Sequence, residues 1–129
     1  MPNRTRYWFH QAERDLEQAE ESRRSGRHEW ACFPIQQAAE KAVKALHLNR
    51  GQEAWGRVIV ELLEGLPNEV AVPPDIIEMA RVLDNFHIPP RYPNSHAAGA
   101  PFQHYGPLQS QQAIDYAGQI LAFARAQMA

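Results

Sequence analysis

The sequence has one cysteine, Cys32, among 129 residues. A single cysteine excludes an internal disulfide and a metal cage made of cysteines. No apolar run approaches the ~18 residues that a membrane-spanning helix needs. No apolar stretch follows the basic residue Arg4 to form a secretory signal. We therefore expect a protein without a membrane span that folds in the reducing cytoplasm.

Glycine-rich segments and a strong excess of charge are also missing. The seven glycines are scattered and form neither a P-loop nor a dinucleotide-binding fingerprint. The formal net charge of −2 argues against a protein that coats nucleic acid through bulk electrostatics, although it leaves room for a local basic pocket. Of the 13 basic residues, only Lys41 and Lys44 are lysine. Arginine suits planar phosphate recognition, but the same bias follows from a GC-rich genome.

Apolar residues recur at helical spacing in five segments, near residues 5–24, 35–46, 58–66, 76–83 and 108–128. The composition, 44% hydrophobic and 22% charged, is that of an ordinary globular protein. A chain of this length forms one domain, because two halves would be too small to bury useful cores. No strand pattern and no repeat is present in the sequence. We expect a single all-α domain over residues 1–129, an antiparallel up-and-down bundle of about five helices, four main ones and a short one.

The second segment has the most regular pattern, with apolar side chains at Ile35, Ala38, Ala39, Ala42, Val43 and Leu46. Small alanines along this stripe allow a neighbouring helix to approach closely. Pro34 leaves two alternatives, a helix that begins near it or one that begins near His28 and kinks. Trp30 and Phe33 are apolar, which favours the earlier start.

Residues 86–107 differ in character from the rest of the chain. Five of the ten prolines fall here, together with His87, Arg91, His96 and His104. Long ordered loops in compact domains often carry function. With no cysteine in the segment and no closely spaced histidine pair, these histidines do not form a metal-ligand pattern. We expect a functional loop, and neither a metal nor another cofactor.

Two stretches of sequence carry a family resemblance. They are WACFPIQQAAEKAVKALHL from Trp30 to Leu48 and ARVLDNFHIPPRYPNSH from Ala80 to His96. Together they resemble the HEPN domain family, named for higher eukaryotes and prokaryotes and for nucleotide binding. The resemblance covers nearly the whole chain. It implies a helical domain that acts on or binds RNA or nucleotides.

The resemblance also implies a chemistry. Many HEPN proteins are metal-independent ribonucleases with an R-x4-6-H motif and an active site formed across a dimer, and Arg91 and His96 fit R-x4-H here. In such a reaction the ribose 2′-hydroxyl attacks the phosphate. Imidazole titrates near neutral pH and can move protons, while a guanidinium steadies phosphate charge. His96 would be the general acid or base and Arg91 the electrostatic clamp.

Further residues are candidates for support or nucleotide binding: Gln37, Glu40 and Lys44 on one side of the second helix, and Tyr92, Asn94, His104 and Tyr105 in the loop. Each set has a structural alternative. Gln37, Glu40 and Lys44 could equally form a solvated edge with a weak ion pair. Arg91 could pair with Asp84 or Glu40 to fasten the loop, and His96 could cap a turn. Cys32 fits a small buried residue better than a nucleophile.

The tryptophans Trp8, Trp30 and Trp55 could stack on bases, although Trp8 lies on an expected helix stripe and fits the core better. Toxin members of the family carry a tyrosine two residues after the histidine, which a nucleotidyltransferase partner modifies. Here that position is Ala98, and Tyr105, which follows His104, does not match the motif. The segment NSHAAGAP also indicates a loop where the toxin motif begins a helix.

Two functions remain open from the sequence. One is a metal-independent endoribonuclease, toxin-like, of a HEPN–nucleotidyltransferase pair. The other is a non-catalytic nucleotide- or partner-binding module of a two-component nucleotidyltransferase system. Both predict a homodimer or a higher homo-oligomer, because a five-helix monomer would leave an apolar stripe uncovered.

Overall fold

The computed structural model describes residues 4–86 and 91–128, and the regular secondary structure in these residues is helical. In chain order the elements are α1 (Arg4–Arg24), α2 (His28–Asn49), α3 (Ile59–Glu64), α4 (Pro74–Leu83), the 3-10 turns η1 (Asp84–Phe86) and η2 (Pro93–Ser95), α5 (Pro101–His104) and α6 (Pro107–Met128). Within these residues no strand forms, and no helix is long and apolar enough to cross a membrane.

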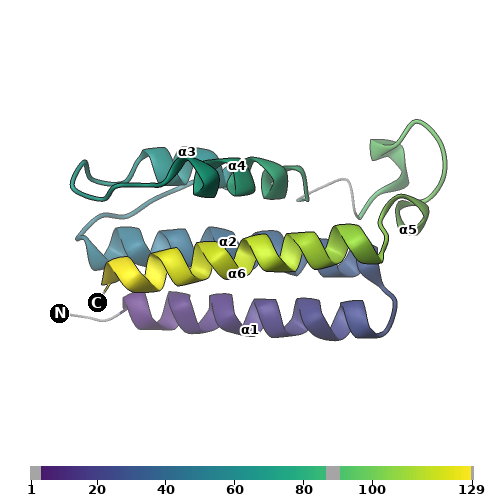
Figure 1. Cartoon of the computed structure of the whole chain (residues 1–129), viewed down its shortest axis with the longest axis horizontal. Coiled ribbons are helices and arrows are strands. Elements are labelled where there is room, and N and C mark those ends of the chain that lie inside the picture. The colour runs from purple at the N-terminus through teal and green to yellow at the C-terminus, as the bar shows by residue number, and fades with distance from the viewer. Residues whose placement is uncertain (1–3, 87–90, 129) are drawn as a thin grey trace.

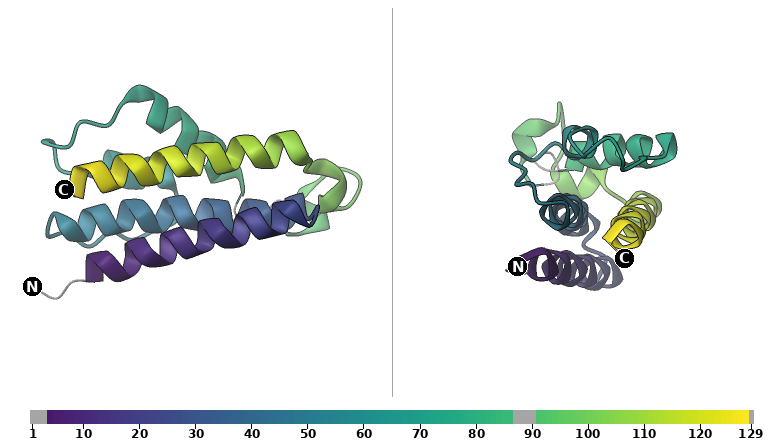
Figure 2. Two further views of the ribbon diagram at one scale, coloured as in Figure 1. Left: turned by 60° about the horizontal axis from the view of Figure 1, so that its bottom comes forward. Right: turned by 90° about the vertical axis from the view of Figure 1, so that its left-hand side faces the viewer.

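The four principal helices alternate in direction, as Figure 1 shows: α1 and α4 run one way, and α2 and α6 the other. The bundle has three tiers, with α1 on one side, α2 and α6 in the middle, and α3 and α4 on the other side (Figure 2). Helix α2 contacts α1, α6, α3 and α4, so it is the centre of the fold. The predicted all-α up-and-down bundle is confirmed, with α2 and α6 lying parallel because α4 returns the chain between them.

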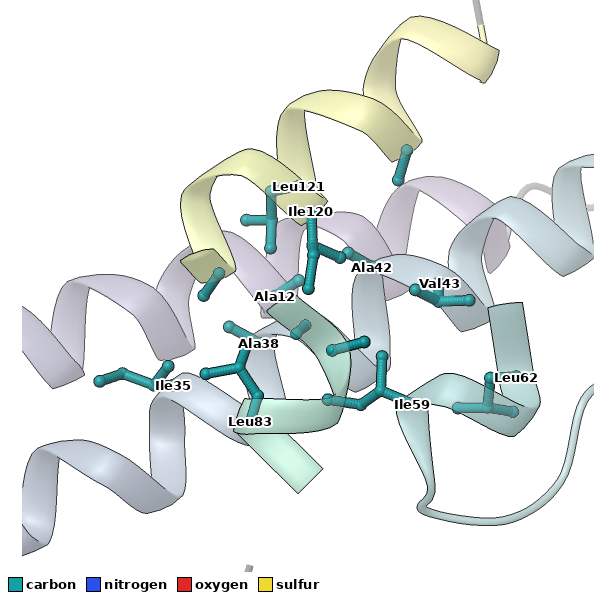
Figure 3. Close-up of a cluster of buried hydrophobic side chains, with 14 of the residues drawn as sticks. Ala12, Ile35, Ala38, Ala42, Val43, Ile59, Leu62, Leu83, Ile120 and Leu121 are labelled. Atoms are coloured by element: carbon teal, nitrogen blue, oxygen red, sulfur yellow. The ribbon is translucent and has the colours of Figure 1, made fainter. Parts of the chain in front are cut away.

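The alanines of α2 account for this close packing. Ala38, Ala39, Ala42 and Ala45 are fully buried, and Figure 3 shows Ala38 and Ala42 facing Ile120 and Leu121 of α6. A methyl side chain holds a neighbouring helix close, whereas larger side chains would push it away. Larger apolar residues fill the space around the alanines: Ile35, Leu46, Ile59, Leu63 and Leu83 are almost completely buried.

Helix α2 begins at His28, so Pro34 lies inside it, as the apolar Trp30 and Phe33 indicated. On α1 the predicted stripe of Trp8, Ala12, Leu16 and Ala19 faces the core, with Phe9 buried in addition. Phe9 is buried beside Ala12 and Ala19, whereas Trp8 and Leu16 are half-buried and pack against the core.

The long loop predicted over residues 86–107 contains two short helical elements, η2 and α5, and the described residues hold six α-helices in all. Pro93 begins η2 and Pro101 begins α5. A proline suits the first position of a helical turn because its φ is already helical and its missing N–H would have had no partner there. His87 lies outside the described residues.

Asp84 holds the start of α3 against the end of α4. Its carboxylate oxygens accept hydrogen bonds from the backbone N–H groups of Ile59, at 2.6 Å, and Val60, at 3.1 Å. These N–H groups belong to the first turn of α3, which has no partner for them within the helix. Burial raises the pKa of the Asp84 carboxyl, and these two hydrogen bonds partly oppose the rise. Asp84, the first residue of η1, therefore caps α3 from a segment that is distant in sequence.

Candidate functional site

The predicted site loop, residues 91–106, lies at the end of the bundle where α1 ends and α2 and α6 begin (Figure 1). Its helix α5 contacts α2. A hydrogen bond beneath the loop joins the starts of α2 and α6: Nδ1 of His28 donates to the Ser110 hydroxyl, at 2.8 Å. The same hydroxyl donates to the Pro107 carbonyl, at 3.2 Å. Three helix ends therefore form one platform for the loop.

A set of stacked rings organises the loop. His96 and His104 are stacked face to face, with ring centroids 4.1 Å apart and planes 7° apart. Tyr105 makes T-shaped contacts with His96, at a centroid distance of 5.7 Å, and with Phe86, at 6.1 Å. Tyr105 is 8% exposed and Phe86 is 6% exposed, so they form the buried base of the cluster. His96 is half-buried and His104 is exposed, so the two imidazoles stand between the core and solvent.

A hydrogen bond determines the tautomer of His104. Its Nε2 lies 2.5 Å from the carbonyl oxygen of Ala98, and because a carbonyl only accepts, Nε2 carries the hydrogen. In neutral His104, Nδ1 is then the nitrogen with the lone pair. Gly99 allows this turn, since its φ of +81° lies in the left-handed region that favours glycine. Gln103 completes the turn by accepting a hydrogen bond from the Ala100 N–H at 2.7 Å.

Arg91 lies over the aromatic rings of two neighbours. The central carbon of its guanidinium is 4.2 Å from the ring centroid of Phe33 and 5.3 Å from that of Tyr92. Phe33 belongs to the first turns of α2, so this cation–π contact fastens the start of the loop to the bundle. Tyr92 and Asn94, also predicted at the site, are exposed beside Arg91. The loop thus gathers Arg91, His96 and His104 at one end of the molecule.

The polar residues of α2 form a different cluster. The Glu40 carboxylate accepts hydrogen bonds from Gln36 at 3.3 Å, Gln37 at 3.4 Å and Lys44 at 3.1 Å. Gln36 also donates to the carbonyl of Arg57 at 3.1 Å, which ties α2 to the segment before α3. Gln36 is fully buried and Glu40 is 5% exposed, so this network stabilises the bundle interior.

This network joins Gln37, Glu40 and Lys44, predicted as supporting or nucleotide-binding residues, to one another. The Lys44 ammonium lies 5.7 Å from the ring of Trp8, at the far end of α2 from Phe33. Eleven residues of α-helix separate the two positions, or roughly 16 Å along the axis. The Glu40–Lys44 ion pair of the solvated-edge alternative is present, at 3.1 Å, but Glu40 is buried and does not lie on a solvated edge. Gln36 was missed, although its place between Cys32 and Ala39 at helical spacing could have indicated it.

Cys32 is fully buried beneath the loop, in agreement with its interpretation as a core residue. Burial, with a smaller contribution from Glu29, raises the pKa of its thiol to about 12. Burial and then the neighbouring Cys32 raise the pKa of Tyr105. Both groups are therefore neutral near pH 7, and neither is prepared to act as a nucleophile. Within residues 4–86 and 91–128, no three His, Cys, Asp or Glu side chains are grouped to hold a metal ion.

Comparison with known proteins covers the bundle and the loop together. The HEPN domain model matches residues 5–127. The crystal structure of TT1696 from Thermus thermophilus is 50% identical, covers 97% of this chain and 98% of its own, and superposes with a TM-score of 0.95. ST0689, an archaeal HEPN homologue, is 39% identical with a TM-score of 0.82 over 97% of this chain and 98% of its own.

A third solved structure extends the series. The HEPN domain protein tm0613 from Thermotoga maritima is 31% identical, with a TM-score of 0.75 over 93% of this chain and 95% of its own. No curated protein matches the chain. The similarity spans the bundle and the loop alike, because each solved relative covers more than nine-tenths of the chain.

Proposed function

The chain belongs to the HEPN domain family, and from this premise we propose that it binds RNA at residues 91–106 and cleaves it with Arg91 and His96, without a metal ion. One observation carries the proposal. The loop brings a guanidinium and two imidazoles, Arg91, His96 and His104, to one end of the bundle on a base of buried rings. Those are the group types that phosphate recognition and proton transfer near neutral pH require.

The proposed reaction moves two protons. The 2′-oxygen attacks phosphorus as a base takes its proton, and the bond from phosphorus to the 5′-oxygen breaks as an acid protonates the leaving oxygen. The products are a 2′,3′-cyclic phosphate and a free 5′-hydroxyl. Arg91 stabilises the extra negative charge on the phosphorane. His96 supplies one proton-transfer group, and His96 of a second copy supplies the other.

Apolar side chains around the loop support a homodimer at this end of the molecule. Tyr92 is 47% exposed, Phe102 64% and Leu108 84%. A second copy related by a two-fold axis would cover these side chains and bring two loops together. The test is Leu108→Glu. Leu108 lies in the first turn of α6, where a carboxylate suits the helix dipole, so the fold should persist while the dimer dissociates.

Sedimentation equilibrium would measure the result. The wild type should sediment as a dimer and Leu108→Glu as a monomer of 14.7 kDa. Tyr7→Glu is the control and should remain dimeric: Tyr7 is 62% exposed in the first turn of α1, which begins at the opposite end of the bundle from the loop (Figure 1). A wild-type monomer at micromolar concentration would contradict a site shared between two subunits.

A non-catalytic module that docks a small nucleotidyltransferase is the second candidate, and it also rests on a specific observation. One face of His96 is stacked on His104, and Tyr105 meets the ring in a T-shaped contact, so the ring also has a packing role. Ala98 stands where toxin members carry the modified tyrosine. Tyr105 is buried, so its modification would require the loop to open.

Cleavage of a mixed RNA pool by purified protein in excess EDTA tests the first candidate against the second. The wild type should leave cyclic phosphate ends, and His96→Ala should lose roughly 100-fold or more of the rate, the usual contribution of a positioned acid or base. Arg91→Ala should lose cleavage as well. His10→Ala and Arg14→Ala, which change exposed residues of α1, are the matched controls for His96→Ala and Arg91→Ala and should cleave like the wild type. RNA binding without cleavage by the wild type would favour the non-catalytic module.

A further inference from the structure

A groove runs beside the loop, between the last turns of α1 and the first turns of α2. It has a volume of about 410 Å³ and is lined by Gln18, Ser22, Arg27, Trp30, Phe33 and Pro34. Trp30 and Phe33 form its apolar side, three residues apart on α2 and therefore on the same face of the helix. Trp30 is 52% exposed, which is unusual for a side chain of its size and leaves much of the indole open to a ligand.

Phe33 connects this groove to the candidate site. Its ring lines the groove and also lies beneath the Arg91 guanidinium, 4.2 Å from it. Trp30 is therefore one helical turn from the aromatic ring that positions Arg91. A chain of nucleotides that placed a phosphate at Arg91 would have a neighbouring base within reach of the groove.

The charge of the groove suits such a ligand. Among the described residues that line it, Arg27 is the one charged side chain, and Gln18 and Ser22 add a polar rim joined by a 3.2 Å hydrogen bond. The groove between α1 and α6 makes the contrast. It has a similar volume, about 370 Å³, but its lining carries three carboxylates, Glu13, Glu17 and Glu20. The one cation among its described lining residues, Arg125, pairs with Glu13, so the groove stays acidic and repels phosphate.

We propose that the Trp30 groove is a base-stacking subsite for single-stranded RNA, next to the phosphate position at Arg91. One base stacks on the Trp30 indole, and Arg27 contacts the phosphate beyond it. Stacking on an exposed aromatic ring is how proteins hold single-stranded nucleic acid without reading its sequence. The inference rests on the proposed function, since it extends the same RNA path. It predicts a preference for single strands, because bases in a duplex have no face open to the indole.

Binding of a fluorescein-labelled single-stranded hexaribonucleotide, followed by fluorescence anisotropy, tests the subsite. All variants carry His96→Ala, so that the RNA stays intact. Adding Trp30→Ala should weaken binding roughly tenfold or more, and Trp30→Phe should restore most of it. Trp55→Ala is the matched control: Trp55 is 85% exposed and lies in the segment after α2, at the far end of that helix from Trp30. It should bind like the parent.

A second measurement tests the subsite without removing the Trp30 indole. In NMR spectra of the His96→Ala protein, the indole N–H resonance of Trp30 should shift as the hexaribonucleotide is added, while that of Trp55 should not. Trp30→Ala binding as tightly as the parent, or a Trp30 resonance that does not move, would overturn the subsite. So would dissociation of a dimer by Trp30→Ala, because the groove would then be a contact between subunits.

The outcomes separate this inference from the proposed function. Binding that depends on Trp30, together with wild-type protein that leaves RNA uncut, would retain the subsite and reject the ribonuclease. Cleavage that depends on His96, together with binding that ignores Trp30, would do the reverse. No binding of RNA by the wild type would reject both.

Discussion

The interior of α2 and the loop over residues 91–106 both carry polar side chains, but they use them differently. In α2, Gln36 and Glu40 are buried and their hydrogen bonds end on other protein groups, including Lys44 and the Arg57 carbonyl. In the loop, stacked rings hold the residues in place, and the exposed His104 faces solvent. A buried hydrogen-bond network stabilises the fold, whereas a cluster of rings at the surface is placed where a ligand can reach it.

Charge and position beside an apolar stripe do not by themselves identify the polar residues of a site. Glu40 and Lys44 are charged, sit beside an apolar stripe and resembled supporting residues in the sequence, yet they bind each other. Arg91 and His96 lie in a segment without periodicity and reach the same end of the bundle. The two sets differ in their contacts, an ion pair within α2 and ring contacts at the loop end, and their substitutions should therefore differ in effect.

The largest expected effect is on the alkylation of Cys32, which lies where the two regions meet. With its pKa raised to about 12 from 9.0, the folded protein has roughly a thousandfold less thiolate at neutral pH than the unfolded chain. Alkylation by iodoacetamide, followed by mass spectrometry, should therefore be slower by orders of magnitude in buffer than in urea.

The same labelling distinguishes the regions. Glu40→Ala should increase the rate of Cys32 alkylation, since weakening the bundle increases the population of open molecules. His96→Ala should leave the labelling rate unchanged. If His96→Ala accelerated labelling as much as Glu40→Ala, disturbing the ring cluster would open the bundle as much as breaking the α2 network, and the separation of the two regions would fail.

Glu40→Ala should lower the free energy of unfolding by roughly 3 kcal/mol, the range for breaking a buried ion pair. The substitution leaves the half-buried Lys44 and the buried Gln36 without their shared acceptor. Urea denaturation followed by circular dichroism measures the change. Glu17→Ala, which removes a carboxylate from an exposed pair on α1, is the control and should change stability by less than ~0.5 kcal/mol. Equal losses in the two variants would contradict a structural role for Glu40.

Asp84→Ala should cost about 1–2 kcal/mol, because α3 loses the acceptor for two backbone N–H groups. Asp84→Asn retains an acceptor and should cost less. The pH dependence has a definite sign. Because the pKa of Asp84 is raised in the folded state, its contribution is most favourable below the unfolded value, near ~3.9, and declines as the pH rises through the folded value.

The two Asp84 variants measured at several pH values provide the check. Stability of the wild type relative to Asp84→Asn should fall from about pH 3.5 upwards, through the window where the raised pKa lies, and then level off. A relative stability that increased over this window would mean that capping α3 outweighs burial in setting the pKa.

Periodicity predicted the bundle but not the site. The stripe from Ile35 to Leu46 fixed the position of α2, and its alanines indicated the close approach of another helix. The stack of His96 on His104 joins residues eight positions apart in a proline-rich segment, and no repeat in the sequence indicates such a contact. The cap that Asp84 places on α3 was equally hidden, because it joins residues 25 positions apart.

Gly99→Ala should have the smallest effect on stability and a larger one on function. The left-handed φ of +81° disfavours any side chain, and an added Cβ would lie 2.9 Å from Oε1 of Gln103 and 3.2 Å from Nε2 of His104. We expect a loss of roughly 1 kcal/mol in stability. The ring of His104 must shift, and with it the stacked His96, so RNA cleavage should fall severalfold. Gly26→Ala is the control, since its φ of +78° is as strained but its Cβ would meet open space. It should lose similar stability and no activity, whereas equal losses of cleavage in both variants would trace the effect to folding instead of the ring stack.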